Sequence, residues 1–297
     1  MATNSLISHD LLARLERLEV AFRRAQRGRP EGERSGGRRG GRIEFADYRE
    51  YSPGDDFRHI DWNVLSRTDD LVVKQFEREE QYVLRLLLDR SGSMGFPRGR
   101  GAPTKLEYGA ACVAALTYVA LGAGHRVEVG AFDRGCQWFP VASDKARITA
   151  LLDHLAGLSA GGATDAAAAA EAVAGRAPEP CLVVLVSDLF GADAAQEPLA
   201  ALAARRFDIS IIHVLSRPEV EPPIRGRIRL RGAESGEAVS LRITEAAAAR
   251  YRRALRDFGE QWSAFCGKHD IRFLATVTDV PFEDFVMRYL RRGGLVR

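Results

Sequence analysis

The sequence predicts a doubly wound α/β fold, in which a mostly parallel sheet is flanked by helices. Short apolar runs alternate with helical patterns along most of the chain, as strands and helices do in βαβ units. Three of these runs are almost continuously apolar, which is typical of strands buried on both faces of a parallel sheet. They lie at 82–88, 181–186 and 209–215. With 297 residues, 46% apolar and 28% charged, the chain is long enough for a large packed core.

The N-terminal part of the chain precedes this alternation. Over residues 8–26, apolar residues recur at helical spacing and arginines take the other side, so we expect an amphipathic helix within residues 1–27. It would dock on its own domain or, alternatively, on a partner. Residues 28–42 are rich in arginine and glycine without an apolar period, which predicts a flexible linker. Residues 43–80 are dense in aromatic and charged side chains, and we expect them to pack on the α/β body.

The α/β domain itself is predicted to cover residues 81–297. Apolar runs give the expected strands, which begin just before that boundary: 71–76, 82–89, 126–132, 181–187, 208–215 and 271–277. Helical spacing gives the expected helices between most of them: 105–121, 145–155, 165–174, 192–204 and 245–266. Residues 218–242 interrupt this order with a Pro-Pro pair, alternating apolar residues and several arginines, so we expect an inserted hairpin there.

Composition excludes several classes of protein. The net charge of +3 is too small to indicate a nucleic-acid or membrane partner by itself. The four cysteines show no CxxC pair and no metal-ligand spacing, which excludes a disulfide scaffold and favours a reducing, cytoplasmic setting. The chain opens on polar residues without a secretory signal, and its longest apolar stretch is too short to span a bilayer. We therefore expect a cytoplasmic protein with no transmembrane segment.

Oxygen-bearing side chains cluster where open α/β sheets bind ligands, beyond the carboxyl ends of the strands. A carboxylate and two hydroxyls leave the strand 82–89 at alternate positions, so they point the same way. A second carboxylate follows the strand 181–187, and a threonine stands in a Gly-rich turn before the helix 165–174. Two carboxylates and three hydroxyls suit Mg²⁺ or Mn²⁺ and not zinc or copper. The predicted metal ligands are Asp89, Ser91, Ser93, Thr164 and Asp188.

These ligands resemble the metal-ion-dependent adhesion site of von Willebrand factor type A domains. The segment before them resembles the signature of the bacterial domain-of-unknown-function 58 family, which runs straight into a type A-like, Rossmann-like domain. That resemblance extends from residue 34 to the end and is carried by RIEFADYREY, PGDD and IDW within residues 42–62. The signature residues singled out are Pro53, Gly54, Asp55, Asp56, Arg58, Asp61 and Trp62.

The carboxylates of the signature have two interpretations. They could be catalytic, but His59 is the only local base and has no nucleophile partner. Paired carboxylates beside arginine are more often structural, so we expect a buried Asp–Arg pair with Trp62 packed over it.

The resemblance implies a non-catalytic, metal-dependent protein-binding adaptor. In the site that it resembles, the serines and the threonine coordinate the metal directly, and the sixth position is left for a carboxylate of a partner protein. A hard cation that is not charge-saturated attracts such an anion. The family also implies the partners, which are a MoxR-type AAA+ ATPase and a client protein during protein or metalloenzyme maturation.

Three alternatives stay open. Asp165 or Thr164 could simply cap the helix that follows. A Mg²⁺-dependent phosphohydrolase also starts with an aspartate after a central strand, but it needs a second acid where Ser91 stands and a lysine after a later strand. We expect all four lysines to lie elsewhere. A nucleic-acid-binding protein could use the Arg-rich segments, but near-neutral charge and the lack of stacking aromatics count against it. We therefore expect neither an enzyme nor a nucleic-acid partner.

Overall fold

The computed structural model describes residues 9–16, 43–68, 70–78, 82–97, 102–140, 148–176, 180–222 and 226–290. These residues fall into two compact units, one within Arg29–Gln81 and the other formed by the remaining described residues. The predicted linker at 28–42 lies outside the described residues. Each unit has its own sheet.

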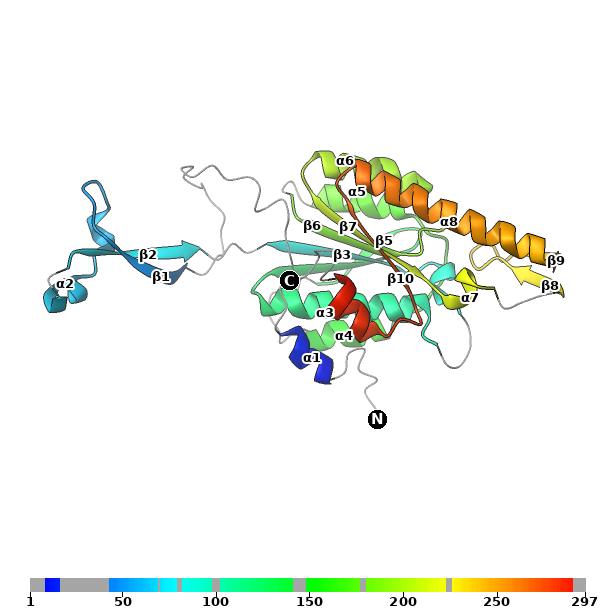
Figure 1. Ribbon diagram of the computed structural model, residues 1–297, viewed down its shortest axis with the longest axis horizontal. Helices are drawn as coiled ribbons and strands as arrows, with labels where there is room; N and C mark the ends of the chain where they lie inside the picture. Colours follow the sequence, from blue (N-terminus) through cyan, green and yellow to red (C-terminus); the bar gives the residue numbers. More distant parts are fainter. Residues whose placement is uncertain are drawn as a thin grey trace. The chain divides into compact units, whose positions relative to one another are not determined.

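A six-stranded sheet organises the larger unit (Figure 1). The strand order is β10-β7-β6-β3-β4-β5, and all neighbours pair in parallel except β5, which pairs antiparallel with β4 at one edge. The strands are β3 (Val83–Asp89), β4 (Arg126–Phe132), β5 (Cys136–Trp138), β6 (Leu182–Ser187), β7 (Asp208–Leu215) and β10 (Arg272–Val277). This mostly parallel sheet confirms the predicted fold class.

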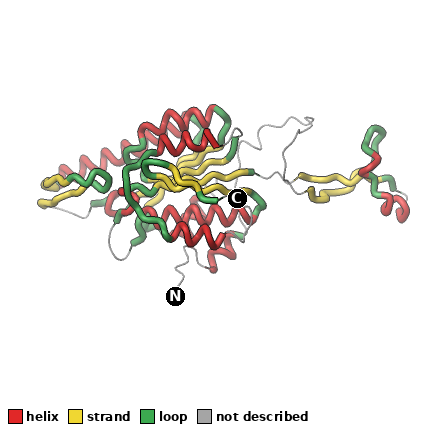
Figure 2. Tube along the Cα trace, turned by 180° about the vertical axis from the view of Figure 1, so that it is seen from behind, coloured by secondary structure: helices red, strands yellow, loops and turns green. Residues whose placement is uncertain are grey.

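Helices cover both faces of the sheet, as Figures 1 and 2 show. One face carries α1 (His9–Leu15), α3 (Lys105–Gly122), α4 (Ile148–Ala156), α9 (Phe282–Asp284) and a short π-helix, Phe285–Leu290. The other face carries α5 (Ala166–Arg176), α6 (Gln196–Ala204) and α8 (Glu245–Lys268). The predicted helices form at these places, and the one expected from residue 192 starts as a 3-10 turn, Asp193–Ala195.

Alternation along β3 divides the core into two layers. Leu86 and Leu88 pack toward the α3 face, and Leu87 packs toward the α5 face. Burying a leucine completely contributes roughly 1.5–3 kcal/mol, so each layer is substantial. Arg85, on the second face, is buried and donates from Nε to Glu128 at 2.8 Å, which compensates its charge.

The N-terminal helix docks on its own domain in its described part. Leu11 and Leu15 of α1 are buried in the core layer that contains α3. The hydroxyl of Tyr118 on α3 donates to Glu16 at 2.8 Å. The rest of the predicted helix, residues 17–26, lies outside the described residues.

The smaller unit holds a two-stranded antiparallel sheet of β1 (Ile43–Glu50) and β2 (Val72–Arg78). Between the strands lie a 3-10 turn, Phe57–His59, and α2 (Trp62–Thr68). The strand expected at 71–76 thus forms, but it pairs with β1, which the sequence did not predict as a strand. That this unit packs on the α/β body stays a prediction.

Local ion pairs connect the signature carboxylates of this unit to arginines. Arg49 donates to Asp55 at 2.7 Å, and Arg58 donates to Asp56 at 2.7 Å. The hydrogen bonds from Arg58 lower the pKa of Asp56 to about 2. The Asp–Arg pairs form, but they are not buried within this unit. Asp56 and Arg58 are only two residues apart, so their pair forms within one exposed turn.

The buried aspartate of the signature is Asp61. One of its oxygens accepts from the backbone N of Asn63 at 3.0 Å, which caps α2, and the other accepts from the Tyr48 hydroxyl at 2.9 Å. Trp62 is 60% exposed, so the expectation that it covers a buried Asp–Arg pair was wrong. It begins α2, and little within the described part of its own unit covers its side chain.

An insertion follows β7 in the larger unit. It contains α7 (Arg217–Val220) and the antiparallel hairpin of β8 (Gly226–Arg231) and β9 (Ala238–Ile243). The predicted hairpin therefore forms. Among the described residues, no helix has the length and apolar character needed to cross a membrane.

Candidate functional site

The candidate site lies where the strand order changes direction. The chain runs from β3 to β4 on one side and later returns to β6 on the other side of β3, so the carboxyl ends of β3 and β6 form the switch point at which open α/β sheets bind ligands. Asp89 is the last residue of β3, and Asp188 directly follows β6.

Backbone hydrogen bonds tie the loop after β3 to the Gly-rich turn before α5. The N–H of Gly92 donates to the carbonyl of Gly162 at 2.9 Å, and the N–H of Gly161 donates to the carbonyl of Arg90 at 2.8 Å. Gly162 has a φ of +77°, a conformation that favours glycine. This pairing brings Thr164 to the loop although it lies 75 residues from Asp89 along the chain.

Asp89 is the centre of a hydrogen-bonded cluster. One carboxylate oxygen accepts from the N–H of Ser91 at 2.8 Å, and the other accepts from the hydroxyls of Ser187 at 2.7 Å and Thr164 at 3.1 Å. The hydroxyls of Ser91 and Ser93 share a hydrogen bond of 3.1 Å. Four of the five predicted ligands therefore lie in one connected cluster, together with Ser187.

Burial determines the protonation of this carboxyl. It raises the pKa of Asp89 to about 6, and the nearby negative charge of Asp188 adds to the effect. The hydrogen bonds from Ser187 and Ser91 favour the charged form but only partly offset the burial. A cation beside the two carboxylates would relieve both effects.

Asp188, the fifth predicted ligand, is held by a buried lysine. Its carboxylate accepts from the Lys105 ammonium at 2.6 Å and from the N–H of Phe190 at 3.0 Å. The same ammonium donates to Glu219 on α7. The side chain of Lys105 has no exposed surface at all, and its pair with Asp188 lies away from water, whereas Glu219 is 15% exposed.

The expectation that every lysine lies away from the site was wrong for Lys105. It is the first residue of α3, inside the capping box formed by Thr104 and Glu107, and its ammonium reaches Asp188. No local signal reveals this contact, because the two residues are 83 positions apart. Its ammonium is fully covered and already paired with two carboxylates, so it does not restore the phosphohydrolase alternative.

His213 and Ser187 complete the buried polar surroundings. The imidazole Nε2 of His213 donates to the backbone carbonyl of Asp188 at 3.1 Å, and burial lowers the pKa of this histidine to about 4. Ser187 could have been found in the sequence, since it precedes Asp188 at the end of an apolar strand. His213 lies inside a strand and carries no such signal.

The donor set fits a hard cation. Among the described residues, no group of three or more histidine, cysteine or acidic side chains is placed to hold a metal ion. The cluster instead offers hydroxyl and carboxylate oxygens, the ligands that Mg²⁺ and Mn²⁺ prefer. Lys105 pairs with Asp188 and Glu219, and Asp188 is near enough to Asp89 for its charge to raise the pKa of Asp89.

The chain matches the family model described as protein of unknown function DUF58 over residues 47–261. It is 31% identical to the uncharacterized proteins Mb1516 of Mycobacterium bovis and Rv1480 of Mycobacterium tuberculosis, over 250 residues that cover 82% of this chain and 77% of each relative.

Similar solved structures include the conserved hypothetical protein BatB from Bacteroides thetaiotaomicron, with a TM-score of 0.46 and 16% identity over 71% of this chain and 98% of that one. A von Willebrand factor type A protein from Catenulispora acidiphila has a TM-score of 0.40 and 15% identity over 76% of this chain and 44% of that one. Because these TM-scores are low, assignment of the chain to a family depends on the sequence matches.

Proposed function

The chain belongs to the DUF58 family, and from that premise we propose that it is a non-catalytic adaptor that binds Mg²⁺ or Mn²⁺ and, through the cation, a carboxylate of a partner protein. One observation carries the proposal. The buried carboxylate of Asp89 gathers hydrogen-bond donors from three separate segments at the switch point of the sheet. Neighbouring carboxylates and hydroxyls of this kind suit a hard cation.

The residues that would hold the cation are Asp89, Ser91, Ser93, Thr164 and Asp188. When bound, the cation supplies a positive centre for a partner's carboxylate. Lys105 contributes by pairing with Asp188, since it offsets one of the two negative charges of this set. The cation therefore keeps more of its positive charge for an incoming anion, as an adaptor requires and a saturated structural metal site would not.

We also propose the class of partner and the compartment. A MoxR-type AAA+ ATPase and its client, met in the cytoplasm, are what the family signature implies. The adaptor would then join ATPase and client through the cation. The resemblance of residues 42–62 and the oxygen cluster of the site support this partner class, and binding to the ATPase is the quantity to measure.

Metal binding is tested by thermal unfolding. Millimolar Mg²⁺, with a dissociation constant about tenfold lower, should stabilise the native state by roughly 1.4 kcal/mol. In a domain of this size that raises Tm by about 2–5 °C. Asp89→Ala should abolish the shift, whereas Asp153→Ala, an exposed aspartate on α4, should keep it. A wild-type Tm that ignores both Mg²⁺ and Mn²⁺ would contradict the proposed site.

Partner binding is tested by capture from native lysate with Mg²⁺ or with a chelator. Ser91→Ala and Thr164→Ala each remove a hydroxyl from the cluster without removing a charge, so the domain should stay folded. We expect each to weaken capture of the ATPase by about tenfold or more, the usual range for disturbed metal sites. Asp153→Ala serves again as control. Equal capture by both hydroxyl variants after loss of the metal would place the interface elsewhere.

A further inference from the structure

The tip of the β8–β9 hairpin reaches the candidate site. The backbone N–H of Thr164 donates to a carboxylate oxygen of Glu234, in the turn between the strands, at 3.3 Å. A Cβ on Gly92, between the two serines of the loop after β3, would lie only 2.4 Å from the carbonyl oxygen of Ala233. The hairpin tip therefore rests directly on the loop that carries two predicted ligands.

The start of the insertion contacts the same site from another side. Glu219 of α7 accepts from Lys105, and its other carboxylate oxygen accepts from the N–H and hydroxyl of Ser216 at 2.8 Å each. The insertion thus brings one acid to each end of the site, Glu219 to Lys105 and Glu234 to Thr164.

These two acids differ in how firmly they are held. Glu219 meets a fully buried ammonium and forms a capping box. Glu234 meets a single backbone N–H and is only half-buried, and no described residue from 226 to 243 is buried. An element with so few buried contacts opens at little free-energy cost. The hairpin tip is therefore held more weakly at the site than Glu219 is.

We propose that Glu234 is a carboxylate carried by the chain itself that occupies the place of the partner's carboxylate at the cation site. The proposal rests on the proposed function. A partner's carboxylate has to approach the cation beside Thr164, where Glu234 now lies, and has to move the hairpin tip from Gly92. The partner class follows from this exchange, since the competitor must present an aspartate, a glutamate or a chain terminus.

The experiment uses the full chain loaded with Mn²⁺, with acetate as the competing carboxylate. Water-proton relaxation counts exchangeable waters on bound Mn²⁺, and hydrogen exchange reports on the Thr164 amide. In Glu234→Gln we expect one more water on the bound Mn²⁺. Acetate should displace water at about tenfold lower concentration than in the wild type, since a tethered carboxylate competes at high effective concentration. The amide of Thr164 should exchange about tenfold faster. Glu237→Gln, an exposed acid close to the same turn, should behave as wild type.

Each failure has its own pattern. If wild type binds Mn²⁺, Asp89→Ala does not, and Glu234→Gln matches wild type with acetate, the role of Glu234 is overturned and the cation site stands. The role of Glu234 is overturned in the same way if only the Thr164 exchange changes, because Glu234 would then merely fasten the hairpin. If neither wild type nor Glu234→Gln binds Mn²⁺, the proposed function fails and the ligand role of Glu234 fails with it.

Discussion

Replacement of Lys105 by methionine is expected to lower the free energy of unfolding by about 3–5 kcal/mol at neutral pH. Methionine fills a similar volume but leaves Asp188 and Glu219 without their shared ammonium. Both carboxylates face a fully buried position, so each would remain charged without compensation or take up a proton. For a domain of this size, the loss corresponds to a fall in Tm on the order of 10 °C.

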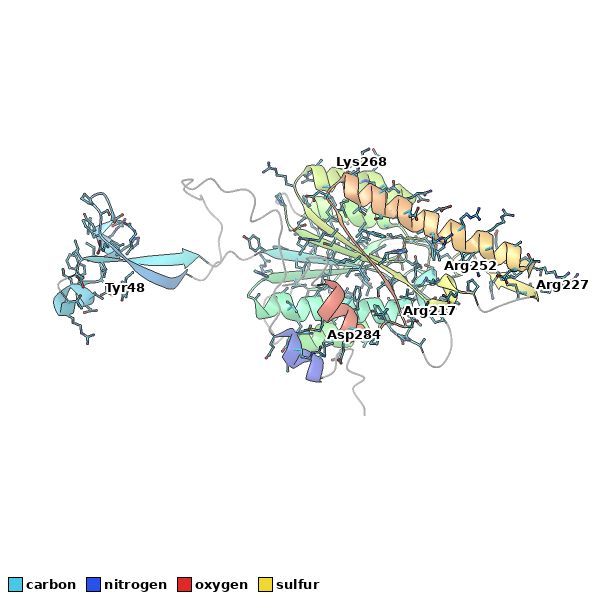
Figure 3. The ribbon with its side chains drawn as sticks, viewed as in Figure 1. Tyr48, Arg217, Arg227, Arg252, Lys268 and Asp284 are labelled. Atoms are coloured by element: carbon cyan, nitrogen blue, oxygen red, sulfur yellow. The ribbon has the colours of Figure 1, made fainter. Side chains whose placement is uncertain are left out.

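Chemical denaturation at pH 7 measures this effect. Lys268→Met is the matched control, because Lys268 is exposed in the last turn of α8 (Figure 3) and should change stability by less than about 0.5 kcal/mol. Equal stability of the two variants would show that the buried pairs contribute no net stability.

Without a divalent cation, Asp89→Asn is expected to stabilise the protein above pH 6. Burial and the charge of Asp188 raise the pKa of Asp89 from 3.8 to about 6, so the folded state binds this proton more tightly than the unfolded state. The proton therefore favours folding at low pH, and that contribution is lost as the pH rises from about 4 to about 6. The difference amounts to about 2–3 kcal/mol at pH 7.

The test compares the pH profile of the unfolding free energy of Asp89→Asn with that of the wild type. His213 acts in the opposite direction, because its pKa is lowered from 6.5 to about 4, and stability is lost as the pH falls through that range. The two trends partly cancel in the wild type, but the contribution of His213 drops out of the difference between wild type and Asp89→Asn. That difference should grow from pH 4 to pH 6 and shrink when Mg²⁺ is added. Parallel profiles would contradict the raised pKa.

The sequence predicted those parts of the fold and site that depend on local pattern. Continuous apolar runs identified the central strands, and their order placed Asp89 and Asp188 at one edge of the sheet. The sequence did not predict the strand β1, because residues 43–50 mix aromatic and charged side chains without clear alternation. These residues form a strand by pairing with β2. Trp62 was misjudged because apolar character alone does not say which way a side chain faces at a helix start.

The remaining site residues depend on contacts between distant segments. Lys105 meets Glu219 across 114 residues, and Thr164 meets Glu234 across 70. Each of these acids looks like an ordinary surface residue in the sequence. Ser187 is different, since its place at the end of a buried strand beside a predicted ligand was a usable signal. The sequence alone could not predict where the insertion lies relative to the sheet.

Because the buried ammonium of Lys105 is part of the protein itself, we expect the domain to stay folded with or without a bound metal. Small metal-stabilised domains lose their structure with the ion, since its coordination supplies their folding free energy. Here the side chain of Lys105 pairs with Asp188 and Glu219 without any bound cation. Chelation should therefore leave a folded protein that can be reloaded many times. If the proposed cation site is real, removal and return of the cation would then change its occupancy without unfolding the domain.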